Sequence, residues 1–159
     1  MQTASKKVIN GWAMYDWANS VYNLVITTTF FPAYYAAITG LKNFPDGIYF
    51  LGRHFVNTEL KDYVLAFGFL IVAVMSPILS SMADYKGNKK NFMRFFCYMG
   101  AASCCMMFFF DKNHVPLGLM CFMFAGIGFY GSQVFYNSYL PEIAAETDQD
   151  RVSAKGYTF

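Results

Sequence analysis

Polar side chains recur along the first long apolar stretch of the sequence, and residues of these types bind polar solutes, ions or one another. They stand three or four positions apart, so they share one face of a helix. Polar groups are costly in hydrocarbon unless they find partners, so this face should meet other helices or water rather than lipid. Two interpretations stay open: the face lines a solute pathway, or its hydrogen bonds hold helices together. The residues are Asp16, Asn19, Ser20, Asn23 and Thr27.

The fourth apolar stretch repeats this pattern of polar residues on one side. Gln133 and Asn137 are spaced i, i+4 and therefore share a helical face, where they are further candidates to line a pathway. Just before them, Gly126, Gly128 and Gly131 would let another backbone approach closely. For the glycines, the spacing favours close helix packing over a role in binding.

Four long uncharged stretches must position these side chains. A helix needs about 20 apolar residues to cross a hydrocarbon core of about 30 Å. The third stretch is the shortest, and it spans if Arg94 extends toward the headgroups. The sequence is 56% hydrophobic and 14% charged, well below the roughly 25% charge of soluble domains. It therefore predicts an all-α, multi-pass membrane bundle with spans at approximately 14–39, 63–83, 92–110 and 115–140.

Composition and residue types argue against several other classes of function. The net charge of +2 is too small and too scattered to indicate nucleic-acid binding. The predicted spans hold no paired carboxylates, histidine cluster or nucleophile–base arrangement, so we expect no enzymatic activity and no cofactor. No histidine lies near the cysteines, which fall within the spans, so we expect neither a metal site nor a disulfide. These cysteines are Cys97, Cys104, Cys105 and Cys121.

Lysine and arginine are unevenly divided between the two sides of the predicted bundle. Because positive residues accumulate on the cytoplasmic side of membrane proteins, the more basic side is expected to face the cytoplasm, and it includes the N-terminus. The membrane would be the plasma or inner membrane, with a vacuolar membrane as the alternative. The cytoplasmic side would carry Lys6, Lys7, Lys86, Lys89, Lys90, Arg94, Arg151 and Lys155, and the opposite side Lys42, Arg53, Lys61 and Lys112.

The loop after the second span, residues 80–90, is the most distinctive segment of the sequence. Asp84 can accept hydrogen bonds from backbone amides at a nearby helix start, where the helix dipole favours a carboxylate. Gly87 permits a tight reversal between two spans. Lys89 and Lys90 would keep the loop on the cytoplasmic side and could pair with acidic groups.

This loop resembles a signature of the major facilitator superfamily, the motif Gly-x-Leu-Ala-Asp-Arg-x-Gly-Arg-Lys between helices two and three. Asp84, Gly87 and Lys89 match the motif. In that family the aspartate belongs to a charge relay that latches the two halves of a transporter, so the resemblance implies a cytoplasmic gate. The basic part of the latch is weaker here, because basic residues are replaced. Ser80, Met82, Tyr85 and Asn88 depart from the motif.

Both ends of the sequence narrow the resemblance further. Residues 10–22, 135–144 and 151–157 look like the vacuole-effluxer branch of the superfamily, the autophagy-related amino-acid exporters and their bacterial relatives. The resemblance covers nearly the whole chain and implies a secondary transporter that moves a small solute by alternating access. Phe122 stands where many proton antiporters of the superfamily carry an arginine. Drug/proton antiport of that type is therefore not expected.

The resemblance also implies how the chain is organised. Residues 1–159 would form an incomplete N-terminal half: the first four helices, and a fifth that begins at approximately 151. The expected partners are the lipid bilayer, a small-molecule solute such as an amino acid or related metabolite, and the remaining C-terminal portion of the same transporter. We expect no transport by these residues alone. The alternative is a small four-span membrane protein that acts in assembly or interaction.

Overall fold

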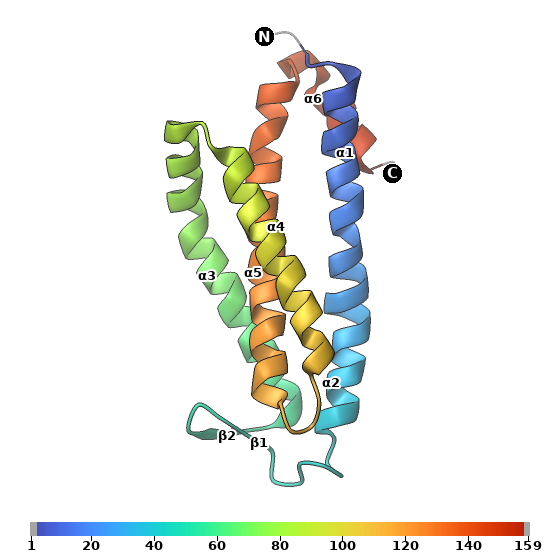
Figure 1. Ribbon diagram of the computed structural model, residues 1–159, viewed down its shortest axis with the longest axis vertical. Helices are drawn as coiled ribbons and strands as arrows, with labels where there is room; N and C mark the ends of the chain where they lie inside the picture. Colours follow the sequence, from blue (N-terminus) through green and yellow to red (C-terminus); the bar gives the residue numbers. More distant parts are fainter. Residues whose placement is uncertain (1–2, 158–159) are drawn as a thin grey trace.

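The computed structural model describes residues 3–157, apart from the side chains of residues 82–84, 86 and 157. The described chain is an elongated helical bundle with both ends of the sequence at one end, so the predicted all-α class is confirmed (Figure 1). The elements are α1 (Lys6–Val21), η1 (Tyr22–Phe30), α2 (Phe31–Thr39), β1 (Ile48–Phe50), β2 (Arg53–Phe55), α3 (Asn57–Lys86), α4 (Lys89–Met106), η2 (Met107–Phe109), α5 (Val115–Ile143), η3 (Glu146–Asp148) and α6 (Gln149–Tyr157).

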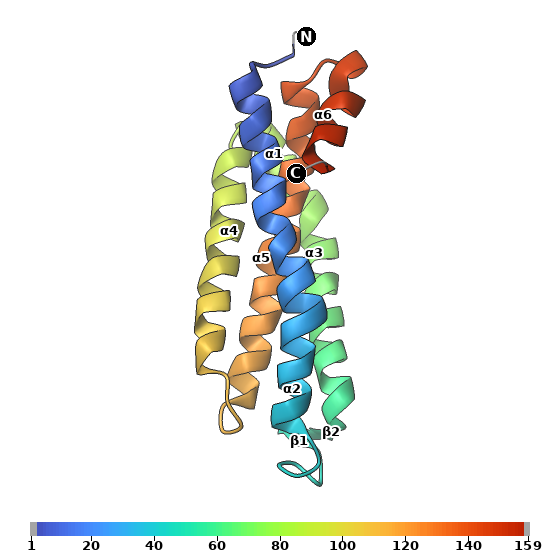
Figure 2. The ribbon, with the colours of Figure 1, turned by 90° about the vertical axis from the view of Figure 1, so that its right-hand side faces the viewer.

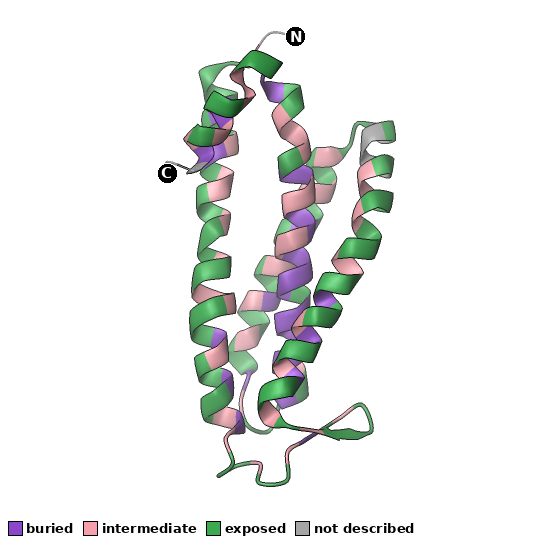
Figure 3. Ribbon diagram, turned by 180° about the vertical axis from the view of Figure 1, so that it is seen from behind, coloured by how far each residue is buried: buried purple, intermediate pink, exposed green. Residues whose placement is uncertain are grey.

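Within the described part of the chain, three helices are long and apolar enough to cross a membrane, by length and composition. Of their apolar windows, 67% of the residues are buried in α5, against 11% in α3 and 17% in α4. The centre of the bundle is therefore α5, with α3 and α4 packed against it and exposing their outer apolar faces (Figure 3). Such outward apolar faces suit lipid. The candidate spans are residues 57–81, 89–109 and 115–143.

The first predicted span is a single helical column made of α1, η1 and α2 (Figure 2). Its middle, Tyr22–Phe30, is π-helical, a form that is rare and often found at functional positions. Pro32 gives a local reason, because it has no amide hydrogen and its ring crowds the carbonyl four residues earlier. A wider turn before the proline relieves that contact. The hydroxyls of Thr28 and Thr29 both donate to the Leu24 carbonyl, at 2.6 and 2.8 Å.

The backbones of α4 and α5 approach each other closely at two glycines. A Cβ atom at Gly128 would lie 2.6 Å from the Gly100 Cα and 2.7 Å from the Phe96 carbonyl oxygen. At Gly131 it would lie 2.6 Å from the Phe96 ring. At Gly126 the nearest atom is the Tyr22 hydroxyl at 3.7 Å, an ordinary contact. The packing role expected of the three glycines therefore belongs to Gly128 and Gly131.

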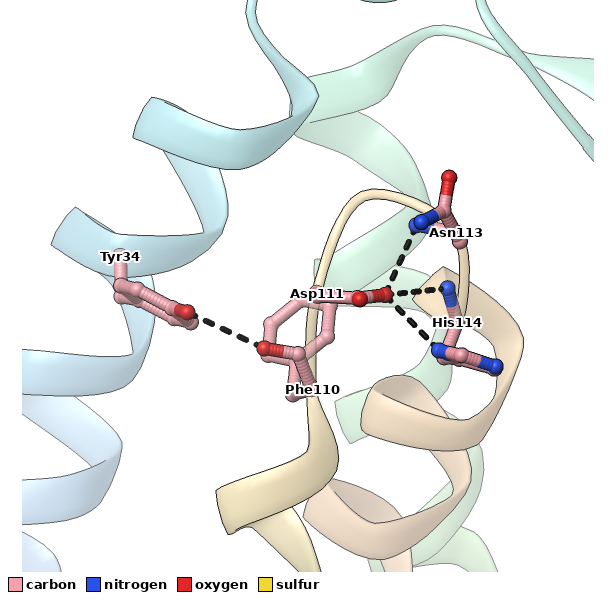
Figure 4. A network of polar contacts seen from close by, with 5 residues as sticks. All are labelled: Tyr34, Phe110, Asp111, Asn113 and His114. Atoms are coloured by element: carbon pink, nitrogen blue, oxygen red, sulfur yellow. Dashed lines mark hydrogen bonds and ion pairs between the residues drawn. The ribbon is translucent and has the colours of Figure 1, made fainter.

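The connection between α4 and α5 is held by one carboxylate (Figure 4). Asp111 accepts hydrogen bonds from the Asn113 and His114 amides, at 2.8 and 2.9 Å, and its Oδ1 lies 2.8 Å from the His114 ring Nδ1. Desolvation acts to raise the pKa of Asp111, but these bonds outweigh it and lower the pKa below its ordinary value. The ionised Asp111 carboxylate therefore stabilises the fold at any pH above its pKa in the unfolded chain. This stabilisation is lost as the pH falls through the lower pKa that Asp111 has in the folded protein. Nearby, the Tyr34 hydroxyl donates to the Phe110 carbonyl at 3.1 Å.

At the opposite end of the bundle, the N-terminal segment is tied to the end of α5. The Ala4 amide donates to the Ile143 carbonyl at 2.8 Å, and the Ala145 amide donates to the Thr3 hydroxyl at 3.2 Å. The Thr3 hydroxyl in turn donates to Asp148 Oδ2 at 2.5 Å. Thr3 thus links the start of α1 to the turn before α6. Below it lies a small apolar cluster of Ile9, Ile143, Ala144 and Val152.

Replacing Thr3 with valine should loosen this end while the rest of the bundle stays folded. Valine keeps the shape of the side chain but removes both hydrogen bonds, so we expect a loss of about 1–2 kcal/mol of local stability. Hydrogen exchange in detergent would show faster exchange at Ala4 and Ala145. Thr147→Val is the matched control, because Thr147 is exposed and nearby. Equal exchange in the two variants would show that the Thr3 link does not hold the segment.

Candidate solute pathway

Polar side chains meet where the first helical column faces α5. The Asn19 amide donates to the Ser132 hydroxyl at 3.4 Å, and the Tyr130 hydroxyl donates to Asn23 Oδ1 at 3.4 Å. Both bonds are at the long end of the hydrogen-bond range, so they are weak and easily exchanged for water or a solute. Ser132 itself was not singled out by the sequence. The spacing of residues in the sequence could not predict these two hydrogen bonds, because each joins residues more than 100 positions apart.

Three more hydroxyls are buried beside this contact. Those of Tyr15, Tyr22 and Thr27 form no hydrogen bond of good geometry with the described residues. Tyr22 faces Thr27, and Tyr15 faces Ser132. A buried hydroxyl without a full partner costs about 1–3 kcal/mol. These groups would therefore gain from a polar molecule that enters the seam between α1 and α5.

A cavity of about 160 Å³ lies beside the contact of Asn19 with Ser132. The first helical column contributes Asn19 and Tyr22 to its wall, and α5 contributes Ser132. Cys97 and Cys104 of α4 lie on the same wall. The cavity has polar groups and room for water, which are the two conditions for a hydrated site.

Aromatic rings join α1 and α5 in the part of this seam nearer the two chain ends. Trp12 stacks on Tyr136 with ring centroids 4.4 Å apart, and its indole nitrogen donates to the Tyr136 carbonyl at 3.1 Å. Tyr15 stacks on the same ring at 5.5 Å. Further along, Tyr22 stacks on Phe129 at 4.8 Å. These contacts fix the position of α1 against α5, so the polar side chains between them are held in place.

The predicted pathway residues fall into two groups. Asn19 and Asn23 are brought to α5, as described above. The carboxylate of Asp16 is partly buried and lies beside Gly156 of α6, 3.7 Å from where a Cβ atom would stand. The exposed Ser20 turns away and donates to the Trp17 carbonyl of its own helix at 2.8 Å. Gln133 is partly buried and Asn137 exposed, and neither side chain forms a hydrogen bond within the described part of the chain.

The predicted gate loop is a tight reversal between α3 and α4. Gly87 has a φ of +62°, a conformation that glycine adopts at little cost. Lys89 Nζ lies 2.6 Å from Glu142 Oε1 and 3.4 Å from the Ser138 carbonyl. The loop is therefore tied to the end of α5 by an ion pair, a partner that the sequence did not reveal. The side chain of Asp84, the third predicted gate residue, lies outside the described residues.

Long apolar helices around a central helix, with a polar seam between two of them, define an integral membrane protein of the multi-pass helical class. The chain belongs to a family described as vacuole effluxer Atg22 like, whose model matches residues 4–158. The resemblance seen in the sequence is thereby confirmed.

Curated proteins that resemble the chain include one with a transporter name and one named for autophagy. The chain is 38% identical over 151 residues to a Bacillus subtilis (strain 168) protein named "Uncharacterized MFS-type transporter YxiO", covering 93% of this chain and 33% of that protein. It is 26% identical over 171 residues to autophagy-related protein 22 of Coccidioides immitis (strain RS), covering 86% of this chain and 28% of that protein. The chain thus spans a third or less of the length of these relatives. No solved structure matches it.

Proposed function

We propose that the chain supplies the first four helices and the start of the fifth in the N-terminal half of a secondary transporter. The transporter moves a small solute, such as an amino acid or related metabolite, by alternating access. The observation that carries this proposal is the polar seam between the first helical column and α5, where Asn19 and Asn23 meet Ser132 and Tyr130. A polar solute that crosses an apolar bundle needs groups along its path with which it can form hydrogen bonds. The weak hydrogen bonds and the buried hydroxyls without a well-formed hydrogen bond can provide them. The transporter name of the Bacillus subtilis relative and the effluxer description of the family favour this function over that of a small membrane assembly protein.

The loop between α3 and α4 would act at the cytoplasmic gate of this transporter. Gly87 sets the reversal, and the ion pair of Lys89 with Glu142 ties the loop to α5. Lys89 is largely covered while Glu142 is about half exposed, so solvent screens the pair and its energy is modest. A modest ion pair can open and close during a transport cycle. Asp84 would complete the gate by contacting the C-terminal portion of the transporter.

Transport by the full-length protein tests the pathway. After a thermal-shift screen has identified a solute among amino acids and related metabolites, its flux is measured in proteoliposomes. Asn23→Leu should lower the transport rate about five- to thirtyfold, since a lost hydrogen bond in the transition between states is worth about 1–2 kcal/mol. Ser20→Ala, on the same helix, should transport normally because Ser20 bonds its own backbone.

Two outcomes would contradict the proposal. One is flux at the wild-type rate in Asn23→Leu, with the variant inserted and folded. The other is an equal loss in Ser20→Ala, which would mean that any change on this helix impairs transport. Absence of flux for every solute in liposomes that contain correctly folded wild-type protein would favour the assembly protein.

A further inference from the structure

A short hairpin of β1 and β2 projects from the end of the bundle away from both chain ends (Figure 1). Its strands pair antiparallel, with Ile48 opposite Phe55, and only Leu51 and Gly52 lie between them. The hairpin lies on the same side of α5 as α3, and the first helical column lies on the other side (Figure 1, Figure 3). It therefore stands beside the end of the bundle where the candidate span of α3 begins.

The tip of the hairpin breaks two local preferences. Leu51 and Gly52 have φ values of +46° and +81°, and a two-residue turn of this kind normally carries asparagine or glycine at the first position. Leucine is strained there because its Cβ atom crowds the backbone. The Leu51 side chain is also 88% exposed, so packing within the described residues does not offset the strain. A strained residue with an uncovered apolar side chain indicates a partner outside the described chain.

The base of the hairpin is fixed, so its tip is held in a defined position. Ile48 is buried in the apolar core, and Phe55 packs against that core. Gly47, with a φ of +88°, lets the preceding loop pass close to β2, where a Cβ atom would stand 2.5 Å from the Phe55 carbonyl oxygen. Across the strands, the Tyr49 and His54 rings lie with their centroids 5.2 Å apart. The hairpin is thus a supported arm with an apolar tip.

The hairpin continues an apolar stripe on the outer face of α3. Phe55 meets the ring of Tyr63 edge-on, with centroids 6.2 Å apart. From Tyr63 onward, exposed apolar side chains follow at intervals of three or four residues, so they share one face of the helix. A face of this kind suits lipid, and the hairpin extends it beyond the start of the helix. The stripe consists of Tyr63, Phe67, Leu70, Val74 and Ile78.

The polar groups of the hairpin match the headgroup layer of a membrane. Arg53 carries the single formal charge of residues 48–55, and it is exposed. A guanidinium group pairs with phosphate through two parallel hydrogen bonds. Tyr49 is also exposed, and tyrosine is enriched at membrane–water interfaces because its ring is apolar and its hydroxyl polar. These residue types fit a phospholipid.

The remaining portion of the protein is the alternative partner, and the polar residues favour a different position for it. The first helical column exposes Ser20 and Asn23, polar side chains that hydrocarbon solvates poorly. More protein or water is therefore needed beside that column, which lies across α5 from the hairpin (Figure 1). The apolar stripe of α3 has no such need. The side that carries the hairpin therefore favours lipid.

We propose that the β1–β2 hairpin is a membrane anchor whose tip inserts into the interface of the phospholipid bilayer. Leu51 enters the region between the headgroups and the acyl chains, and Tyr49 lies among the headgroups. Arg53 binds lipid phosphate. The anchor holds the neighbouring ends of α2 and α3 at a fixed depth. It requires that α3 crosses a membrane, and it does not depend on transport of a solute.

Photocrosslinking of the full-length protein tests the anchor. The protein carries 4-benzoylphenylalanine, which bonds to nearby C–H groups on illumination, in place of Leu51. It is placed in nanodiscs of phosphatidylethanolamine and phosphatidylglycerol, and mass spectrometry should find phospholipid adducts at position 51. The matched control carries the same residue in place of Asn43, which is exposed in the loop of residues 40–47, and should give none. That loop extends farther from the helices than the hairpin does (Figure 1).

Three outcomes of this experiment would overturn the proposal. The first is an adduct of position 51 with protein alone, which would mean that the hairpin docks on the remaining portion of the chain. The second is the absence of any adduct at position 51. The third is an equal yield of lipid adducts at positions 51 and 43.

A second variant separates insertion from the geometry of the turn. Leu51→Asn keeps the turn, because asparagine adopts a positive φ more readily than leucine, but it removes the apolar side chain. With the photoreactive residue in place of Tyr49, Leu51→Asn should lower the yield of lipid adduct about tenfold or more, the ratio expected for burial of one leucine side chain. Leu41→Asn, the same change at an exposed leucine outside the hairpin, should leave the yield unchanged. An undiminished yield in Leu51→Asn, or an equal loss in Leu41→Asn, would show that the tip does not insert.

Discussion

Replacing Gly128 with alanine is expected to push α4 away from α5 and to lower the stability of the bundle. Replacing it with leucine is expected to prevent the bundle from assembling. The new Cβ atom would stand 2.6 Å from the Cα of Gly100, a backbone atom that cannot rotate away. Overpacking of this kind costs about 1–3 kcal/mol for one methyl group, partly offset by the roughly 1 kcal/mol by which alanine favours a helix over glycine. The leucine side chain adds further atoms to the same clash. We therefore expect lower thermal stability for alanine and aggregation for leucine.

Gly126→Ala is the matched control, two positions earlier on the same helix. Its Cβ atom would stand 3.7 Å from the Tyr22 hydroxyl, so the helix-forming preference of alanine acts without a clash. Thermal unfolding in detergent should show the control at or above wild-type stability and Gly128→Ala below it. Size-exclusion chromatography should show the leucine variant as aggregate. Equal behaviour of Gly126→Ala and Gly128→Ala would mean that α4 and α5 do not approach at this point.

The class of fold could be predicted from the sequence, because the apolar stretches are long enough to specify membrane helices before any tertiary contact forms. The placement of side chains around those helices needed the structure. Asn19 and Ser20 are neighbours in the predicted stripe, yet they point about 100° apart on a helix. Asn19 consequently reaches α5, while Ser20 bonds its own backbone.

Other features depend on contacts that local patterns do not encode. Glu142 belongs to a segment that reads as an ordinary acidic loop, but it is paired with Lys89 from the distant gate loop. The three glycines of α5 look alike in sequence, and their roles differ because Gly100 and Phe96 face two of them. The π-helical turn reflects the position of Pro32 within a helix that continues past it. In each case the residue that determines the local structure or contact lies on another element, or further along the same helix.

Replacing Phe122 with alanine is expected to lower the free energy of unfolding by about 3 kcal/mol. Its side chain is 1% exposed, and its ring stacks on Phe31 with centroids 3.8 Å apart and planes at 1°. Phe31 in turn stacks on Phe110 at 5.6 Å, so one row of rings joins α2, α5 and the loop after η2. Phenylalanine-to-alanine changes in cores cost about 3–5 kcal/mol. We expect the lower end of this range, because lipid solvates the separated helices. The phenylalanine ring is then not exposed to water, and part of the hydrophobic transfer free energy does not contribute.

Phe122→Arg tests whether this position can accommodate the arginine that many proton antiporters of the superfamily carry there. Phe122 belongs to a cluster of buried apolar side chains, so an arginine here would place a charge among apolar groups. A buried unpaired charge costs several kcal/mol, and the arginine variant should be less stable than the alanine variant. Phe124→Ala is the matched control, because Phe124 is 41% exposed on the same helix and should change stability little. The stabilities are measured by unfolding in urea or detergent. Wild type and Phe124→Ala should be the most stable, Phe122→Ala less stable, and Phe122→Arg the least stable. An arginine variant as stable as wild type would show that a charge partner reaches this position.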